Sequence, residues 1–227
     1  MTNIAKISAL ASAPPDTSGV WDDLVQQDRV HRRVYTDDSI FAREMDNIFA
    51  ATWVYLAHES EIPEPNDFKL SWIGLREVIV ARDEDGVVHA FSNRCSHRGA
   101  SVCREHQGNA ADFTCPYHGW RFDNRGQLFG IPGKSADGPK FKSRDMNLAR
   151  PAQLGSYKGF VFATLNPDAT PLLQHLGNAA RYLDAWIDHN GGPENLCLAG
   201  AHRFRLACNW KMVGDNAGDG YHVPFSH

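Results

Sequence analysis

The sequence contains no long apolar run and no excess of positive charge. Its apolar stretches are short, as in Gly159–Leu165, whereas a helix that crosses a bilayer needs about 20 apolar residues. Lys and Arg number 23 against 27 Asp and Glu, which gives a formal net charge of −4. Without a basic field, we expect neither nucleic-acid binding nor association with an anionic membrane.

Cysteine is also scarce, and the five that occur are an odd number. An odd count does not favour a disulfide framework, so we expect a reducing compartment, the cytoplasm, where thiolates are available for metal. Ala11–Ala13 resembles a signal-peptidase site, but the apolar stretch before it is short and broken by serine. We therefore interpret the N-terminus as a loose tail.

The order of patterns along the chain predicts an all-β unit flanked by helices. Apolar positions with helical spacing predict a helix that begins near Asp37. Aromatic and β-branched residues then predict short strands, with turns at Asp85-Gly86 and Asn124–Gly126. The predicted strands are Trp53–Leu56, Phe68–Ile73, Glu77–Ala81, Val87–Ser92 and Phe160–Leu165.

Helices are also expected after this unit. Thr170 can cap a helix whose first turn contains Pro171, and Asn190 with the two glycines after it ends that helix. Alternation predicts a strand over Leu198–Leu206, and Asn209–Tyr221 is predicted to be helical. Hydrophobic residues make up 42% and charged residues 22% of the chain, which is typical of a globular protein.

The strongest motif is a pair of loops that each contain one cysteine and one histidine. Cys95 and His97 form the first pair, and Cys115 and His118 form the second. Two thiolates and two imidazoles suit a [2Fe–2S] cluster with both cysteines on one iron and both histidines on the other. A zinc site is the weaker alternative, because zinc ligands usually occur as C-x₂₋₄-C and H-x₃₋₅-H pairs.

Glycines follow both histidines closely, at Gly99 and Gly119, and they allow the backbone to approach the sulfides. Tyr117 and Trp120 can shield the cluster from water. The other three cysteines, Cys103, Cys197 and Cys208, have no histidine at the spacing of a metal ligand. We therefore expect them to be small core residues.

The motif C-x-H-R-G followed by C-P-Y-H-G-W resembles the Rieske family, and the resemblance covers about residues 53–167. Respiratory Rieske proteins add a second cysteine in each loop and a membrane anchor. Neither is found here, so that type is disfavoured. A small Rieske ferredoxin would end near residue 165, so the residues that follow decide between the remaining types.

A second candidate metal site lies near the C-terminus. His222 and His227 are five residues apart, and Pro224 between them is expected to end a helix near His222. Two histidines and a carboxylate with open positions bind Fe(II) and activate O₂. An isolated H-x₄-H pair is a weak motif, and it gains weight from the Rieske motif in the same chain.

The block N-W-K…D-N…D-G-Y-H-x₄-H resembles the mononuclear-iron segment of ring-hydroxylating oxygenase α subunits. The resemblance implies that His222 and His227 bind the iron. It also implies that Asp219 links the two metal sites, by bonding to an iron histidine and to a Rieske histidine of a neighbouring subunit. The family usually has Glu where Asp215 stands, which puts any role for Asp215 in doubt.

The fold class implied by the resemblance is α+β, with an all-β Rieske domain at residues 52–168. This domain is inserted in a catalytic domain, an antiparallel sheet with helices, to which residues 1–51 and 169–227 belong. The third iron ligand of the family, an Asp, is expected downstream of His227. Residues 1–227 alone are therefore expected to hold mononuclear iron weakly and to hydroxylate nothing.

The resemblance also implies partners and a reaction. Electrons from NAD(P)H would arrive through a reductase or a ferredoxin, and O₂ would be added to an aromatic ring. A small β subunit and a trimeric core, α3 or α3β3, are expected. Ala100–Arg104 with Gly108-Asn109, and the segment Asp219–His222, look most like those of oxygenases that act on benzoate, salicylate, anthranilate or related aromatic acids. The alternative is a Rieske electron carrier without catalysis.

Overall fold

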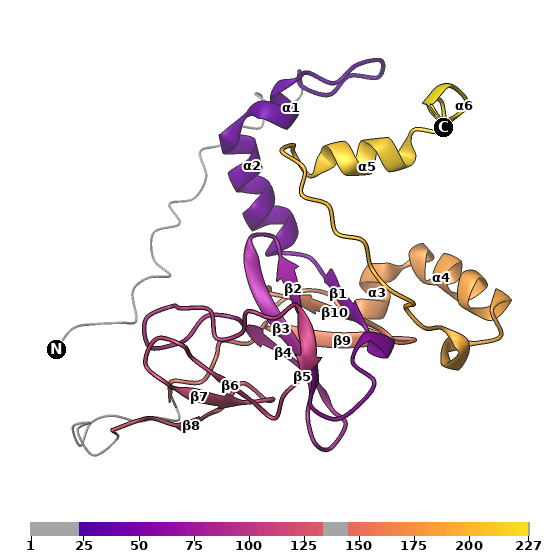
Figure 1. The fold of residues 1–227 in the computed structure, drawn as a ribbon. Coiled ribbons are helices and arrows are strands. Elements are labelled where there is room, and N and C mark those ends of the chain that lie inside the picture. The colour runs from indigo at the N-terminus through magenta and orange to yellow at the C-terminus, as the bar shows by residue number, and fades with distance from the viewer. Residues whose placement is uncertain (1–22, 134–144, 227) are drawn as a thin grey trace. The chain divides into compact units, whose positions relative to one another are not determined.

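The computed structural model describes residues 23–133 and 145–226 (Figure 1). Contacts within the chain divide it into two compact units. The larger unit is formed by Arg43–Arg203, and the smaller unit combines Met1–Ala42 with Phe204–His227. All ten strands of the described residues lie in the larger unit.

The larger unit contains three antiparallel sheets, with strand orders β1-β10-β9, β4-β3-β2-β5 and β6-β7-β8. The five predicted strands are confirmed as β1, β2, β3, β4 and β10. The strands are β1 (Val54–His58), β2 (Asp67–Ile73), β3 (Arg76–Arg82), β4 (Val88–Ser92), β5 (Gln107–Asn109), β6 (Asp112–Thr114), β7 (Arg121–Asp123), β8 (Leu128–Gly130), β9 (Gln153–Tyr157) and β10 (Phe160–Thr164).

Both predicted turns are present, and a buried carboxylate joins them. Gly86 and Gly126 have positive φ angles of 83° and 73°, as tight turns require. Asp83 accepts a hydrogen bond from Arg125 of the second turn at 2.8 Å, and it lies 2.8 Å from Nε2 of His89 on β4. The network fixes the β3–β4 hairpin against the turn between β7 and β8.

Aromatic packing forms a core around the candidate cluster ligands. Phe113 packs edge-to-face against Phe68 and Phe91, with ring centroids 5.2 and 5.7 Å apart. Cys95 and Cys115 are buried in this same core, which lies between the second and third sheets. Burying a Phe side chain stabilises a fold by roughly 1.5–3 kcal/mol. The loops with the two cysteines therefore begin from well-packed positions.

A second core fills the space between the first and second sheets. It is formed by buried aliphatic side chains of β1, β2, β3, β4 and β10 and by Ile62, which lies between β1 and β2. The buried members are Leu56, Ala57, Ile62, Ile73, Val78, Val80, Ala90, Val161 and Ala163. Strand β3 contributes Val78 and Val80 to this core and Ile79 and Ala81 to the other, so it is buried on both faces.

Two helices replace the single helix predicted after residue 170. They are α3 (Leu172–Leu176) and α4 (Asn178–His189), separated at Gly177, whose φ of 48° and ψ of −125° are not helical. Pro171 directly precedes the first turn and Thr170 does not cap it, so that part of the prediction is wrong.

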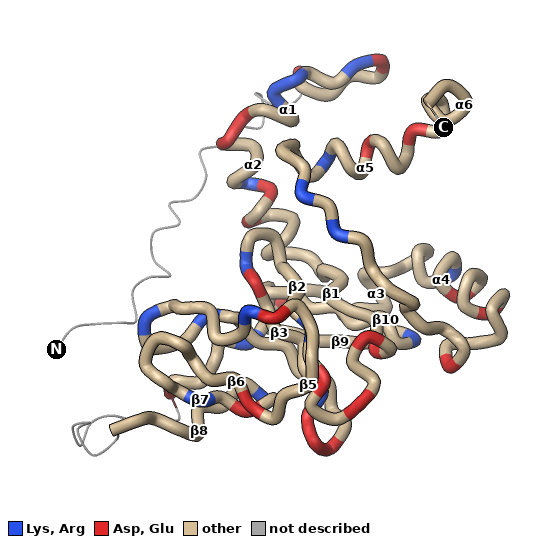
Figure 2. Tube along the Cα trace, viewed as in Figure 1, with Lys and Arg blue, Asp and Glu red and all other residues tan. Residues whose placement is uncertain are grey.

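Helices α1 (Arg33–Thr36) and α2 (Asp38–Glu44) confirm the predicted helix near Asp37, and a π-helical turn continues α2 over Met45–Phe49. Helix α5 (Lys211–Gly218) confirms part of the helix predicted from residue 209. Basic and acidic residues are interspersed along these helices (Figure 2).

The described residues correct three further predictions. No strand forms over Leu198–Leu206. Alternating apolar and polar residues make a strand only where a neighbouring strand pairs with the backbone N–H and C=O groups. Pro224 does not end a helix; it lies in the first turn of α6 (Val223–Ser226), where its missing N–H costs nothing. Cys103 is buried as predicted, but Cys197 and Cys208 are exposed.

No helix in the described ranges is long and apolar enough to cross a membrane.

Candidate metal centres

The two Cys/His loops close with the same backbone hydrogen bonds. The N–H of Cys95 donates to the carbonyl of Ala100 at 2.8 Å, and the N–H of Cys115 donates to the carbonyl of Trp120 at 2.8 Å. Each bond spans five residues, although the histidine is the second residue after Cys95 and the third after Cys115. The shared pattern presents each cysteine and histidine from one rigid turn.

Glycine is required at the same position of both loops. Gly99 and Gly119 have φ angles of 77° and 68°, a region that other residues rarely adopt. Their N–H groups donate to the carbonyls of Cys95 and Cys115 at 2.8 and 2.9 Å. A Cβ on Gly119 would lie 3.0 Å from Cγ of Pro132. The glycines are therefore needed for the two turns themselves, and the predicted approach of the backbone to the sulfides stays a prediction.

The two cysteine side chains meet in the core. They are free thiols rather than a disulfide, and both are buried. Burial is the main cause that raises the pKa of the Cys95 thiol, and the neighbouring Cys115 adds to it. The N–H groups of His97 and Arg98 lower that pKa by donating to the sulfur. Such donors stabilise a thiolate that binds metal.

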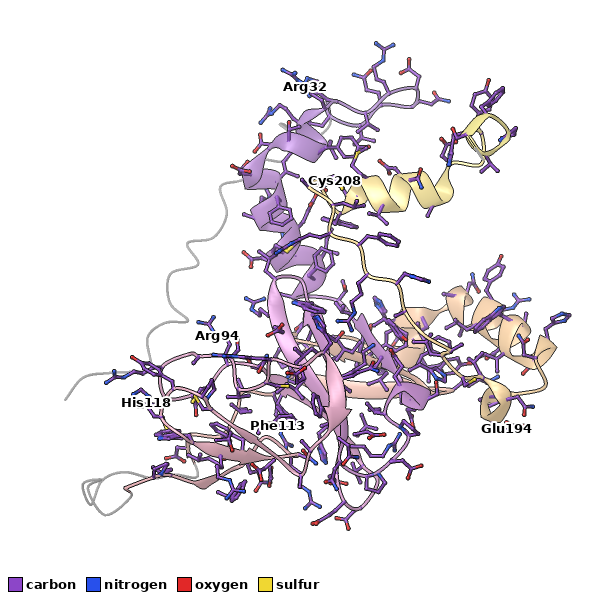
Figure 3. All side chains as sticks on the ribbon, viewed as in Figure 1. Arg32, Arg94, Phe113, His118, Glu194 and Cys208 are labelled. Atoms are coloured by element: carbon purple, nitrogen blue, oxygen red, sulfur yellow. The ribbon has the colours of Figure 1, made fainter. Side chains whose placement is uncertain are left out.

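The two histidine rings lie beside each other at the ends of the loops. The ring centroids of His97 and His118 are 4.5 Å apart. Trp120 stacks on His97 at 4.7 Å with an interplanar angle of 9°, and Tyr117 covers His118 at 3.9 Å. Trp120 is buried, whereas Tyr117 is 58% exposed. Figure 3 shows His118 at the edge of the larger unit.

These four residues fit a [2Fe–2S] cluster. The Nδ1 atoms of His97 and His118 are buried, and that of His118 has no hydrogen-bond partner among the described residues. A buried nitrogen in this state is suited to an iron ligand. The described residues contain no group of three or more His, Cys, Asp or Glu for one metal ion. Two thiols and two imidazoles are the donor set expected for one iron with two cysteines and one iron with two histidines.

Two residues that the sequence did not reveal fix the first loop. Asn93 is buried, and its amide donates to Glu77 at 2.6 Å and to the carbonyl of Cys103 at 2.7 Å. The hydroxyl of Ser96 donates to the carbonyl of Met146 at 2.5 Å. None of these three contacts follows from local spacing, because the partners lie 10, 16 and 50 positions away along the chain. The only sequence signal is that both residues lie within two positions of Cys95.

Asp219 and His222 are in close contact in the smaller unit. Oδ2 of Asp219 lies 3.2 Å from Nδ1 of His222. The pKa of Asp219 is lowered chiefly by the N–H of Tyr221, which donates to Oδ1 at 2.8 Å, and also by His222. The pair lies in the turn between α5 and α6, not on the helix predicted from spacing. His227 lies outside the described residues.

Comparisons with known proteins agree with this assignment. Residues 52–156 match the Rieske [2Fe–2S] domain, and residues 193–227 match the ring hydroxylating alpha subunit catalytic domain. The chain is 40% identical over 216 residues to toluate 1,2-dioxygenase subunit alpha of Pseudomonas putida, which covers 91% of this chain and 47% of that protein. It is 42% identical over 202 residues to 2-halobenzoate 1,2-dioxygenase large subunit of Burkholderia cepacia, covering 88% and 43%.

A solved structure also matches. The structure of naphthalene 1,2-dioxygenase from Rhodococcus sp., bound to indole, has a TM-score of 0.78 and 42% identity, and covers 86% of this chain and 45% of that chain. The chain thus spans about half the length of the curated relatives it matches. It belongs to the family of Rieske ring-hydroxylating oxygenase α subunits, and its predicted fold class is confirmed.

Proposed function

We propose that the whole protein is the large (α) subunit of a terminal oxygenase that hydroxylates an aromatic ring with O₂. The observation that carries the proposal is the combination of two ligand sets in one chain. Two cysteines and two histidines meet in the larger unit, and His222 is held by Asp219 in the smaller unit. A simple electron carrier has no need of the second set.

The residues of the larger unit would hold the cluster and keep water from it. Cys95 and Cys115 would bind one iron, and His97 and His118 would bind the other. When bound, the cluster supplies single electrons and the mononuclear Fe(II) activates O₂. Trp120 covers the His97 ring, which excludes water from that side of the site. Neutral imidazoles in place of thiolates leave less negative charge, which favours reduction.

Asp219 would orient His222. A carboxylate beside Nδ1 keeps the proton on that nitrogen and leaves the Nε2 lone pair available for iron. His227 would supply the second imidazole, and the family resemblance implies a further carboxylate. The second role of Asp219, a bond to a Rieske histidine of a neighbouring subunit, belongs to the same proposal.

The domain division follows the resemblance as a proposal. Residues 52–168 form the Rieske domain, and residues 1–51 with 169–227 belong to the catalytic domain. The match of residues 52–156 to the Rieske [2Fe–2S] domain supports the first boundary. The compact units divide the chain elsewhere, after Ala42 and Arg203.

The proposed partners are a reductase or ferredoxin that delivers electrons from NAD(P)H, a small β subunit, and two further α chains in an α3 or α3β3 assembly. The proposed location is the cytoplasm. An aromatic carboxylate such as benzoate, salicylate or anthranilate is the proposed substrate. Relatives named for toluate and 2-halobenzoate support this class, whereas the solved relative is named for naphthalene.

The test is turnover by the whole protein, purified anaerobically and supplied with NADH, a ferredoxin and its reductase, and O₂. We expect a hydroxylated product from benzoate, salicylate or anthranilate. Product from naphthalene alone would refute only the substrate class. A cluster that is reduced while no aromatic compound is hydroxylated would favour the electron carrier. Zinc in place of iron in the native protein would overturn the proposal.

A further inference from the structure

Helix α5 has few stabilising features of its own. It is eight residues long, none of them is buried, and the N-cap residue Trp210 makes no side-chain cap bond, although the Asn209 side chain accepts a hydrogen bond from the N–H of Lys211 at 3.1 Å. Gly214 and Gly218 lie within it, and glycine has a low helix propensity. Helices of this length are marginal unless another element packs against them. The turn that contains Asp219 and His222 follows directly, so its position depends on how α5 is held.

A tyrosine far away in the sequence bonds to the middle of α5. The hydroxyl of Tyr35, on α1, donates to Oδ2 of Asp215 at 2.6 Å. The two residues are 180 positions apart and lie in the same compact unit. The Lys211 ammonium lies 6.0 Å from the centre of the Tyr35 ring, so Tyr35 contacts two successive turns of α5. The pKa of Tyr35 is raised, chiefly by its bond to Asp215.

Asp215 also leads directly to the candidate iron ligand. Its carbonyl accepts a hydrogen bond from the N–H of Asp219 at 3.0 Å, the last bond of α5. Asp219 in turn pairs with Nδ1 of His222 at 3.2 Å. A short series of contacts therefore runs from Tyr35 through Asp215 to the imidazole. Figure 1 shows the elements that these residues belong to, α1 and α5.

We propose that Asp215 is a positioning residue, anchored by Tyr35, that fixes the turn with Asp219 and His222 and thereby holds mononuclear iron in place. The inference rests on the proposed function. It gives a role to the Asp that stands where the family usually has Glu, because the Tyr35 hydroxyl reaches the shorter side chain. The hydrogen bond between Tyr35 and Asp215 fixes the position of α5, and Asp215 itself is proposed to contact neither iron nor substrate.

The experiment removes each partner in the whole holoprotein. Tyr35→Phe deletes only the hydroxyl, and Asp215→Ala deletes the acceptor while keeping a residue that favours the helix. We expect each variant to release mononuclear iron to a chelator about threefold to tenfold faster than the wild type. The double variant should release iron no faster than either single variant, because one contact is lost in all three. Asp215→Glu, which keeps a carboxylate acceptor, should stay closer to the wild type than Asp215→Ala.

A matched control separates positioning from general stability. Tyr182→Phe removes a hydroxyl from an exposed tyrosine on α4, and it should leave iron release unchanged. The visible spectrum of the [2Fe–2S] cluster and the melting temperature should be the same in all variants. Unchanged iron release in Tyr35→Phe, or additive effects in the double variant, would overturn the proposal.

Hydrogen exchange distinguishes failure of this inference from failure of the proposed function. In iron-free whole protein, Tyr35→Phe should speed amide exchange in Lys211–Asp219 and leave α4 unchanged. Wild-type protein that binds no mononuclear iron would refute the proposed function, while the exchange result still tests the anchor. Identical exchange in Tyr35→Phe and wild type would overturn the anchor whatever the iron content.

Discussion

Asp83 is a buried carboxylate that accepts hydrogen bonds from the N–H groups of Asp85 and Val87, and its other oxygen lies 2.8 Å from both His89 and Arg125. Burial alone would raise the pKa of Asp83, but these bonds outweigh it and lower the pKa to about 2. A lowered pKa means that the folded state prefers the charged form. The resulting stability is present above the ordinary pKa near 4 and is lost as pH falls toward 2.

We therefore predict that Asp83→Asn destabilises the protein by about 2 kcal/mol at pH 7. The difference in melting temperature between wild type and variant should be nearly constant above about pH 5 and should shrink as pH falls from about 4 toward 2. Calorimetry at several pH values measures it, and Asp168→Asn, on an exposed residue, is the control. A difference that stays constant with pH would contradict the linkage to this carboxylate.

His118 differs from cysteine in the charge it brings to a cluster. We predict that His118→Cys lowers the reduction potential by on the order of 100 mV, because an added thiolate opposes the uptake of an electron. Potentiometric titration of the holoprotein measures the shift. Tyr117→Phe changes only an exposed side chain beside His118 and should leave the potential close to that of the wild type. An unchanged potential in His118→Cys would show that His118 is not a ligand.

Asp219 joins the backbone of its turn to His222. In the whole protein, we predict that Asp219→Asn leaves the cluster reducible but lowers oxygenation about tenfold to a hundredfold, because the amide keeps the size of the side chain and loses the charge that orients the imidazole. Rapid reduction by dithionite and product formation are measured separately. Equal turnover by variant and wild type would contradict this role.

At the scale of single elements, the second cluster loop depends on one glycine. Gly119 has a φ of 68°, and an added Cβ would lie 3.0 Å from Pro132. We predict that Gly119→Ala destabilises the fold by about 1–3 kcal/mol. The midpoint of thermal bleaching of the cluster measures the loss. Gly200→Ala is the control, since nothing lies within 4 Å of its added Cβ. Equal midpoints for the two variants would be evidence against strain at Gly119.

Elements with a strong local signal were predictable from the sequence. Strands β2 and β3 are rich in aromatic and β-branched residues and are seven residues long each, so both their residue types and their length indicate a strand. The proximity of the four candidate cluster ligands was equally predictable, because C-x-H and C-x-x-H spacing places each cysteine and histidine in one turn. For His222 and Asp219, the resemblance identified the pair, although the helix expected to present them ends at Gly218.

Elements that depend on distant partners were not predictable. Strands β5, β6, β7 and β8 have three residues each, which is too few to show the two-residue alternation of apolar and polar side chains in a strand. The alternation of Leu198–Leu206 looked like a strand, but its side chains such as Phe204 are exposed and no partner strand binds it within the described residues. The contacts of Asn93 and of Tyr35 join residues far apart in the sequence, and single-sequence patterns contain no record of them.

At the scale of the whole molecule, the two candidate sites are distributed between the compact units. Both cores, all ten strands of the described residues and the four candidate cluster ligands lie within Arg43–Arg203. His222 and Asp219 lie in the other unit. Cluster binding should therefore be separable from mononuclear iron binding.

Contacts at the edges of the larger unit bear on where the Rieske domain can be cut. The indole N–H of Trp53 donates to the carbonyl of Thr170 at 2.7 Å, and Phe49 packs against Gly74. The hydroxyl of Tyr157 donates to Asp184 of α4 at 2.7 Å. A fragment of residues 52–168 would lose all three contacts.

We predict that Arg43–Arg203, expressed alone, holds a reducible [2Fe–2S] cluster. The temperature at which its cluster absorbance is lost should be close to that of the whole chain. The fragment 52–168 should also bind the cluster, since every ligand and both cores remain, but it should melt several degrees lower because the three edge contacts are gone. Iron and sulfide content and the melting of cluster absorbance measure both effects. A folded Arg43–Arg203 fragment that binds no cluster would show that the smaller unit is needed to form the site. Equal melting of the two fragments would show instead that the edge contacts stabilise nothing, and the proposed boundary at residues 52 and 168 would be the better description of the Rieske domain.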